Sequence, residues 1–437
     1  MVWISNPVSR LSGRILPPGD KSCSHRALMF AALASGRSVI SGLLEGDDVL
    51  RTGEACRALG ANVKQIAPYT WEVIGTGGYS QPDDRIDFGN SGTGSRLMMG
   101  AMAGFPIRVD LTGDESLRSR PMARVLDPLK SMGADVKGED PDRLPLTLIG
   151  SSDLQAIDYT PPHASAQVKS AILLAGLNAK GTTIVREARK TRDHTERMLE
   201  GFGIELTQEA VGEGQNISIV GGQSLTPVDF TVPGDPSSAA FLFAAGMISP
   251  DADVTIEGIM TNPTRAGLLK LAYDMGELED LERHTISGEE VVTVRVTGSG
   301  RVKRAIPGQE LTAAMIDEFP IYAVLAAFAE GETRITGAEE LRVKESDRIT
   351  ATVNMLRANG VEADELPDGF VIQGCNGKVP GGGVVETMHD HRIAMSALIM
   401  GTASQEPVGV DDIAMIATSY PEFFQHMRTL GADIREA

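Results

Sequence analysis

A glycine that ends an amphipathic helical stretch recurs six times along this chain of 437 residues, at intervals of 70 to 84 residues. Each copy is followed by alternating apolar and polar residues, which predict a strand. Glycine just after the last apolar residue of a helix is the usual left-handed stop, and a nearly constant long period indicates a repeated structural unit. The six positions are Gly60, Gly133, Gly203, Gly276, Gly360 and Gly431.

A second series of segments recurs at the same intervals as the glycines. Alanine-rich runs that predict helices recur once per period, and most are followed by a β-like segment. Together the two series predict a β-α-β-α-β-β unit of roughly 70 to 80 residues. The runs occupy residues 27–34, 96–103, 169–177, 238–247, 321–329 and 392–400.

The sixth unit runs out of chain after Ile434, so we expect residues 2–9 to donate its missing strand. Three units per domain then predict two α/β domains, 14–232 and 1–13 with 233–437, and a substrate cleft between them. The alternative fold is a doubly wound nucleotide-binding sheet. It is less favoured because no Gly-x-Gly-x-x-Gly follows the first strand and paired strands close each unit.

The charge balance restricts the class of partner. Lys and Arg number 40 against 59 Asp and Glu, a net charge of −19, which argues against nucleic acid and anionic membranes as partners. No apolar stretch is long enough to span a bilayer, and the N-terminus does not resemble a signal peptide. The three cysteines form neither a disulfide framework nor a metal-ligand spacing. We expect a cytoplasmic protein.

Against this acidic background, residues 16–26 combine a turn, a helix start and two cations. Lys21 and Arg26 stand about one and a half turns apart, beside backbone N–H groups that lack helical partners. Such a helix start is suited to a phosphate or a carboxylate, although an ordinary solvated helix start is the alternative interpretation. The spacing of Gly19 and Lys21 is not that of a Walker loop, so it does not predict nucleotide triphosphate binding.

Charged residues recur at equivalent helix starts in the later units, and this recurrence favours an anion site over solvated surface. His389, Asp390 and His391 could instead be metal ligands, but no third His or Cys lies at a useful spacing. Glu345 and Arg348 are three residues apart, so a helix salt bridge worth about 0.3 kcal/mol is their alternative explanation. The segments concerned are residues 87–94, 118–124, 165–169, 317–320, 342–348 and 389–392.

Taken together, residues 19–26, 89–93, 120–121, 165–167, 342–348 and 390–392 resemble the 5-enolpyruvylshikimate-3-phosphate synthase family, and the resemblance runs from about residue 10 to the C-terminus. It implies two inside-out α/β domains of three units each, closing on their substrates. It also implies a transferase of the shikimate pathway of aromatic amino-acid and chorismate biosynthesis. The implied reaction moves the enolpyruvyl group of phosphoenolpyruvate to the 5-hydroxyl of shikimate 3-phosphate, releasing phosphate, without metal or cofactor. We expect a monomer with these two small-molecule substrates.

The resemblance also implies residue roles. Shikimate 3-phosphate would be held by Lys21, Ser22, Arg26, Ser165, Ala166, Gln167, Arg192, Asp317 and Lys344. Phosphoenolpyruvate would be held by Lys21, Gly92, Arg120, Gln167, Arg348 and Arg392. For catalysis we expect Asp317 as the base, Glu345 as the acid at the methylene carbon, and Lys21 as a bridge between the substrates. The seven cations and two anions of this set leave an excess of five positive charges, close to the charge of two phosphorylated carboxylates.

Three residues depart from the enterobacterial pattern, namely Ala166, Glu340 and Thr418, and they indicate the second bacterial branch of the family. Family members with Ala at the position of Gly92 resist the inhibitor glyphosate, so we expect a sensitive protein here.

The sequence has two alternative interpretations. UDP-N-acetylglucosamine enolpyruvyl transferase shares the fold and the donor, but it has a Cys in the loop before its Arg-Pro, and residues 114–120 hold none. A non-catalytic anion-binding protein would tolerate loss of Asp317 or Glu345, and both are present.

Overall fold

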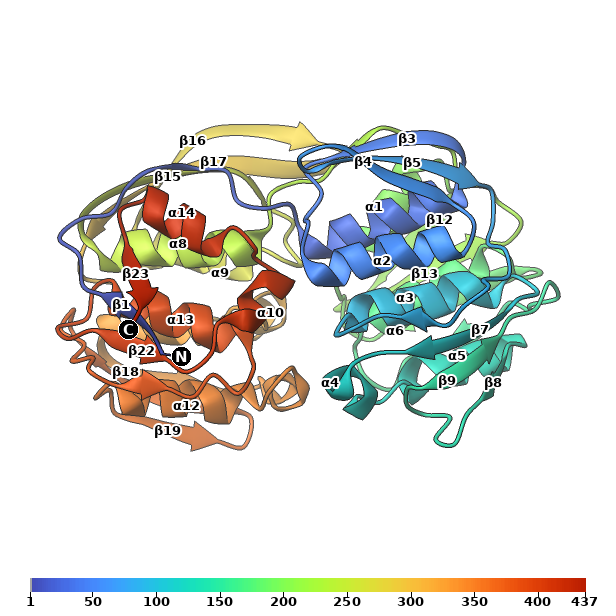
Figure 1. Ribbon diagram of the computed structural model, residues 1–437. Coiled ribbons are helices and arrows are strands. Elements are labelled where there is room, and N and C mark those ends of the chain that lie inside the picture. The colour runs from blue at the N-terminus through green and yellow to red at the C-terminus, as the bar shows by residue number, and fades with distance from the viewer. Residues whose placement is uncertain (1) are drawn as a thin grey trace. The chain divides into compact units, whose positions relative to one another are not determined.

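The computed structural model describes residues 2–437, and the chain divides into two domains. The inserted domain is Lys21–Val232, and the discontinuous domain joins residues 2–20 to Pro233–Ala437 (Figure 1). The first passage between them lies after Asp20, later than the predicted position near residue 13. The reason is that strand β2 (Ser12–Ile15) pairs with a strand of the discontinuous domain, in register from Ser12↔Asp253 to Ile15↔Ile256.

The inserted domain contains three four-stranded sheets. In spatial order they are β14 (Phe230–Thr231), β3 (Ser35–Ser41), β5 (Thr70–Thr76) and β4 (Asn62–Ala67); β6 (Ile86–Asp87), β7 (Arg108–Thr112), β9 (Leu146–Ile149) and β8 (Asp135–Lys137); and β10 (Asp158–Tyr159), β11 (Thr182–Glu187), β13 (Gly214–Val220) and β12 (Leu206–Val211). Its helices are α1 (Lys21–Leu33), α2 (Asp47–Ala58), α3 (Gly92–Ala103), α4 (Glu115–Ser119), α5 (Ala123–Met132), α6 (Ala166–Gly176) and α7 (His194–Gly201).

The discontinuous domain contains two four-stranded sheets and one of three strands. They are β16 (Glu277–Ile286), β17 (Glu289–Ser299), β15 (Pro250–Met260) and β2; β18 (Glu330–Ile335), β20 (Gly369–Cys375) and β19 (Ala363–Leu366); and β21 (Val384–Val385), β22 (Val408–Val410), β1 (Trp3–Asn6) and β23 (Asp433–Glu436). Its helices are α8 (Pro236–Ile248), α9 (Gly267–Met275), α10 (Gln309–Ala314), α11 (Phe319–Phe328), α12 (Arg348–Ala358), α13 (His391–Gly401) and α14 (Phe423–Thr429), with 3-10 turns η1 (Glu339–Val343) and η2 (Ala414–Thr418).

The sheets share one plan, which confirms the predicted β-α-β-α-β-β unit. In each four-stranded sheet the outer short strand runs parallel to its neighbour, and the other pairings are antiparallel. The predicted donation by the N-terminal residues is also confirmed. β1 lies between β22 and β23, with Ile4 opposite Gly409 on one side and Arg435 on the other.

Two short strands are exchanged where the chain passes between the domains. β2 precedes α1 in sequence yet joins the sheet of α8, whereas β14 precedes α8 yet joins the sheet that follows α1. The two passages lie side by side, because Gly19 bridges Gly234 and the Asp20 N–H donates to the Pro233 carbonyl at 2.8 Å. The chain therefore enters and leaves the inserted domain at neighbouring points of the discontinuous domain.

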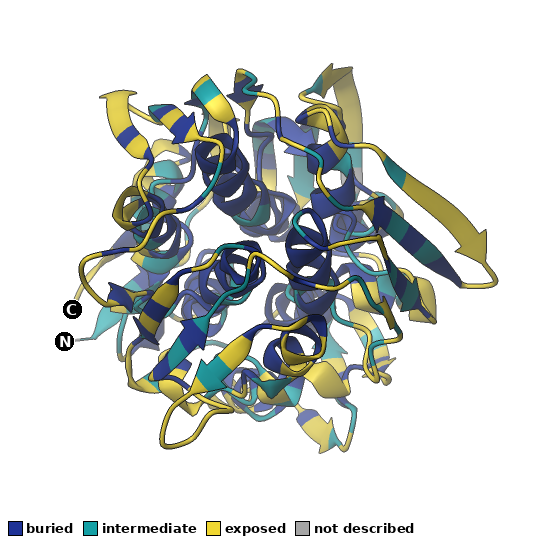
Figure 2. Cartoon of the chain, turned by 90° about the vertical axis from the view of Figure 1, so that its right-hand side faces the viewer, coloured by how far each residue is buried: buried dark blue, intermediate teal, exposed yellow. Residues whose placement is uncertain are grey.

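Buried helices form the interior of each domain. All thirteen residues of α8 and all ten of α11 are buried, and α11 packs against both α8 and α13. In the inserted domain α3 packs against α6. Figure 2 shows buried helices in dark blue, surrounded by strands that carry exposed residues. The six alanine-rich runs form α1, α3, α6, α8, α11 and α13, which confirms the inside-out arrangement.

The predicted left-handed helix stop occurs at five of the six glycines, with φ between 76° and 113°. It is wrong at Gly276, where φ is −152° because α9 runs directly into β16. A Cβ there would lie 2.6 Å from the Cε of Met247, the flexible end of a side chain that can move aside. Within residues 2–437, no helix has the length and apolarity to cross a lipid bilayer.

Candidate active site

Several of the predicted site residues lie at the N-terminal ends of helices in each domain. α1 begins at Lys21, α3 at Gly92 and α6 at Ala166, while α12 begins at Arg348 and α13 just before Arg392. Helix N-termini carry unpaired N–H groups and a partial positive charge. Each domain thus presents a half-site suited to anions.

Local capping explains why the helices begin at these residues. The Ser91 hydroxyl accepts from the N–H of Gly94, and the Ser165 hydroxyl accepts from Val168. In the discontinuous domain Asp347 caps α12 and Asp390 caps α13 through side-chain bonds to backbone N–H groups. Ser and Asp at these positions stabilise a helix by about 1 kcal/mol.

Gly92 lies between two guanidinium groups in the inserted domain. A Cβ on Gly92 would lie 3.1 Å from Nη1 of Arg96 and 3.2 Å from Nη1 of Arg120. Arg96 donates at 3.0 Å to the side-chain oxygen of Gln167. The structure thus brings Gly92, Arg120 and Gln167 together around Arg96. Arg96 also belongs to this group. It was not among the predicted residues, although it lies four residues after Gly92 on the same helix face.

Further hydrogen bonds hold this corner in place. Arg120 Nη2 donates to Asn90 Oδ1 at 2.6 Å, and Asn90 in turn donates to Asp114, the cap of α4. Gln167 donates to the Thr93 hydroxyl at 3.0 Å. The loop before α3, the loop before α5 and the start of α6 are therefore joined through side chains.

Lys21 and Arg26 on α1 differ in their surroundings. The Lys21 ammonium pairs with the carboxylate of Asp48, in the first turn of α2. Arg26 is buried, and its Nε donates to the Thr195 hydroxyl at 2.7 Å while Nη2 donates to the Ser170 hydroxyl at 3.0 Å. Arg26 therefore links α1 to α6 and α7 in addition to being a candidate ligand.

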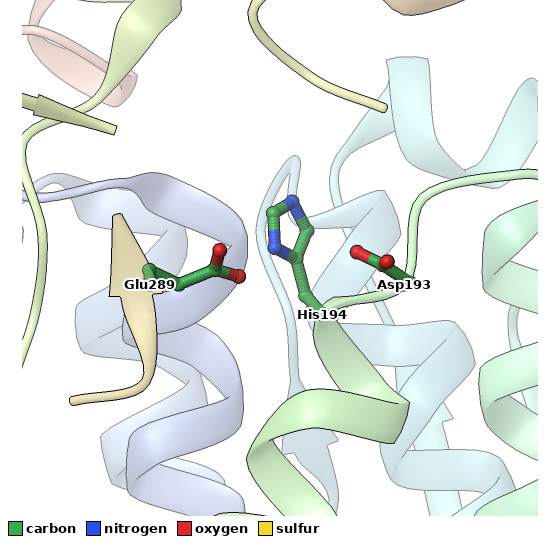
Figure 3. A group of neighbouring side chains, drawn as sticks. All are labelled: Asp193, His194 and Glu289. Atoms are coloured by element: carbon green, nitrogen blue, oxygen red, sulfur yellow. The ribbon is translucent and has the colours of Figure 1, made fainter. Parts of the chain in front are cut away.

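Arg192 lies half-buried in the loop that leads into α7. The next two residues, Asp193 and His194, begin this helix, as Figure 3 shows. The Asp193 carboxylate lies 3.3 Å from Lys190 Nζ and 3.1 Å from Arg197 Nε. Glu289, also drawn in Figure 3, is the first residue of β17.

In the discontinuous domain one guanidinium contacts three carboxylates. Arg348, only 1 % exposed, lies 3.3 Å from Asp317 Oδ1, 2.6 Å from Glu345 Oε2 and 2.8 Å from Asp390 Oδ2. Lys344 Nζ lies 3.2 Å from the same Asp317 oxygen. Burial alone would lower the pKa of Arg348, but Asp390 and the other carboxylates raise it above its ordinary value. The two candidate catalytic carboxylates thus share one permanently charged partner.

Arg392 is held by a second buried network. Its Nη1 donates to the Asp317 carbonyl at 2.9 Å and to Glu318 Oε1 at 3.2 Å. Glu318 also lies 3.2 Å from Nη1 of Arg265, a buried residue whose Nη2 bonds to Asp235 at 3.0 Å. Burial raises the pKa of Asp235 to about 6, although Arg265 opposes the shift. Arg265 and Glu318 were not predicted as site residues, and no local sequence signal pairs them.

The contacts revise the predicted charge balance. Three cations of the discontinuous domain, Lys344, Arg348 and Arg392, are in contact with four carboxylates, those of Asp317, Glu318, Glu345 and Asp390. The excess positive charge of the predicted site residues therefore lies in the inserted domain.

The two imidazoles of the metal-site alternative differ in environment. His389 is 89 % exposed and lies 3.5 Å from Asp412. His391 is buried, and this burial lowers its pKa to about 4.

The family model of EPSP synthase (3-phosphoshikimate 1-carboxyvinyltransferase) matches residues 5–427. The chain is 62% identical to the 3-phosphoshikimate 1-carboxyvinyltransferase of Hyphomonas neptunium over 440 residues, covering 100% of both chains. It is 53% identical over 426 residues to that of Afipia carboxidovorans, covering 97% of this chain and 96% of the relative. A solved EPSP synthase from Acinetobacter baumannii is similar with a TM-score of 0.89 at 37% identity, covering 100% of both chains.

Proposed function

Because the chain belongs to the EPSP synthase family, we propose that it transfers the enolpyruvyl group of phosphoenolpyruvate to the 5-hydroxyl of shikimate 3-phosphate and releases phosphate. The observation that carries the proposal is the 62% identity, over the whole chain, to a relative named for this activity. The geometry adds support, because Asp317 and Glu345 lie against the same guanidinium, next to Lys344.

Binding is divided between the half-sites. In the inserted domain, Ser22, Arg26, Ser165, Ala166, Gln167 and Arg192 bind shikimate 3-phosphate, and Gly92, Arg120 and Gln167 bind phosphoenolpyruvate. Lys21 contacts both substrates. Arg348 and Arg392 of the discontinuous domain also bind phosphoenolpyruvate, and Asp317 and Lys344 bind shikimate 3-phosphate. Guanidinium forks suit planar carboxylates and phosphates.

The reaction is an addition followed by an elimination. The 5-hydroxyl oxygen bonds to the central carbon of phosphoenolpyruvate while Asp317 takes the hydroxyl proton and Glu345 gives a proton to the methylene carbon. The phosphate then leaves with its bonding electrons and takes up the proton that Asp317 had accepted. The new methyl group returns a proton to Glu345, which restores the double bond. The cations at the helix starts stabilise the departing phosphate.

Glu345 must be protonated for the first step, and here its Oε2 lies 2.6 Å from Arg348 Nη2. A substrate carboxylate that binds Arg348 would compete for this guanidinium, so binding itself would free Glu345 to take up a proton. The remaining ion pairs of Arg348, with Asp317 and Asp390, would keep the guanidinium oriented.

The test is phosphate release by the purified protein given phosphoenolpyruvate with shikimate 3-phosphate, beside a reaction given UDP-N-acetylglucosamine instead. We expect release only with shikimate 3-phosphate. Release only with the sugar nucleotide would replace the proposal by the other enolpyruvyl transfer. If neither reaction releases phosphate, the result would favour a non-catalytic anion-binding protein. Asp317→Asn serves as the matched loss-of-activity control.

A further inference from the structure

The ammonium group of Lys169 on α6 is fully buried, outside the residues assigned to substrate binding. Its side chain is 0 % exposed and lies 2.9 Å from Glu187 at the end of β11 and 2.7 Å from Glu196 on α7. Both carboxylates are themselves buried. Removing charges from water costs several kcal/mol per ion, and apolar residues of similar volume often serve stability as well. The cluster therefore calls for an explanation other than packing.

The first element that the cluster fixes is the loop that carries Arg192. Glu187 accepts a hydrogen bond from the Thr191 hydroxyl, and Lys169 Nζ donates to the Thr191 carbonyl at 3.5 Å. From β13, Gln215 donates to Glu187 at 2.9 Å and holds this carboxylate in turn. The residue directly before Arg192 is thus tied through both its side chain and its backbone.

The second element is the pair of hydroxyl groups that orients Arg26. Ser170 follows Lys169 on α6, and Thr195 precedes Glu196 on α7. Their hydroxyl oxygens lie 2.7 Å apart, and each accepts a hydrogen bond from the Arg26 guanidinium. The ion pair between Lys169 and Glu196 and this hydroxyl pair are adjacent links between the same two helices. The ion pair therefore sets the distance between α6 and α7, and Arg26 needs this distance to bond to both hydroxyl groups.

We infer that Lys169, with Glu187 and Glu196, is a positioning residue for shikimate 3-phosphate. It holds the Arg192 loop and the α6–α7 spacing that orients Arg26, without contacting the substrate itself. The inference rests on the proposed function. It predicts that the cluster affects the binding of shikimate 3-phosphate selectively, because Arg26 and Arg192 belong to the set for that substrate. Of the residues proposed for phosphoenolpyruvate in this domain, Arg120 is held by separate hydrogen bonds to Asn90 and Ser116.

The test is Lys169→Met, which keeps the length of the side chain and removes its charge. We expect KM for shikimate 3-phosphate to rise about tenfold or more, since small misplacements of binding groups have effects of this size. KM for phosphoenolpyruvate and kcat should stay within about twofold of the parent values, because the groups that set them are not displaced. Direct titration of shikimate 3-phosphate, followed by calorimetry, should show the same loss. Lys180→Met is the matched control, because Lys180 pairs with Asp153 and is 68 % exposed.

Lys169→Met leaves two buried carboxylates without their cation, so two milder variants accompany it. Lys169→Met with Glu196→Gln removes opposite charges together, and Thr191→Val removes only the link from the loop to Glu187. Both should fold and raise KM for shikimate 3-phosphate, Thr191→Val by the smaller factor. Folded variants with unchanged KM for this substrate, or with equal rises for both substrates, would overturn the inference. Failure of the parent to bind shikimate 3-phosphate would instead overturn the proposed function.

Discussion

Gly100 is where the backbones of α3 and α6 come into direct contact, and Gly100→Ala tests whether this contact sets the stability of the inserted domain. A Cβ at residue 100 would lie 2.2 Å from the carbonyl oxygen and 2.5 Å from the Cα of Ala171. Real Cβ atoms essentially never lie closer than 3.0 Å to such atoms, so the helices must move apart by about 0.8 Å. The atoms involved belong to the backbone and cannot rotate away.

A separation of this size forfeits a quarter to a half of the dispersion energy of each affected contact, and overpacking of a core costs about 1 to 3 kcal/mol or more. The higher helix propensity of Ala returns about 1 kcal/mol. We expect a net loss of up to about 2 kcal/mol in the free energy of unfolding of the inserted domain. Gly53→Ala in α2 is the matched control. Its Cβ would meet Leu28 at 3.7 Å and Val63 at 3.8 Å, which are ordinary contacts, so we expect a gain of about 0.5 to 1 kcal/mol.

The assay is urea unfolding followed by tryptophan fluorescence. The chain has two tryptophans, Trp3 in the discontinuous domain and Trp71 in the inserted domain. Trp71 is buried on β5 and therefore reports on the inserted domain in a Trp3→Phe background. If Gly100→Ala unfolds at the same urea concentration as Gly53→Ala, or at a higher one, the argument from close helix approach is refuted.

Three further predictions concern the half-sites. Glu345→Gln should abolish turnover while calorimetry still detects shikimate 3-phosphate binding; near-normal turnover would remove Glu345 from the role of acid. Gly92→Ala would bring a methyl group 3.1 to 3.2 Å from the flexible ends of Arg96 and Arg120. It should leave the unfolding midpoint nearly unchanged and raise the inhibition constant of glyphosate, and an unchanged constant would contradict the prediction. His391 has a pKa of about 4 in the folded protein against 6.5 for a free imidazole, so between these values only the unfolded state is protonated. Stability should therefore fall as pH drops from 6.5 to 4, by up to about 3 kcal/mol. His391→Gln should lose part of this dependence in urea unfolding at several pH values, and identical pH profiles would argue against it.

The repeated units could be predicted because the signals that define them are local. Each signal spans only a few residues: a glycine that ends a helix, an alanine-rich run, or an alternating strand. Their period predicts the number of units. The choice of partner strand is not local. β2 lies next to α1 in sequence but pairs with β15, so the passage between domains lies after Asp20 rather than near residue 13. Gly276 differs from the other five glycines because α9 runs directly into β16, and the pairing of β16 with β17 is likewise a tertiary feature.

The candidate site divides in the same way. Residues within short motifs, such as Gly92, Gln167 and Arg348, could be identified by their resemblance to a family. The groups that hold them could not. Arg265 meets Glu318 across 53 residues of sequence, and Lys169 meets Glu196 only because α6 and α7 pack together. Buried ion pairs of this kind arise from tertiary packing, and the sequence around one partner gives no sign of the other.

The backbone bridge between Gly19 and Gly234 has a consequence for how the chain can be divided. Residues 21–232 carry every strand of their own three sheets, and the chain leaves and re-enters the discontinuous domain at hydrogen-bonded neighbours. A short linker from Asp20 to Pro233 would therefore excise the insertion and keep β2 and β1 in their sheets. We expect both pieces to be obtainable as separate proteins. Each half-site would then be open to titration with a single substrate, and the contribution of one set of cations could be measured in the absence of the other.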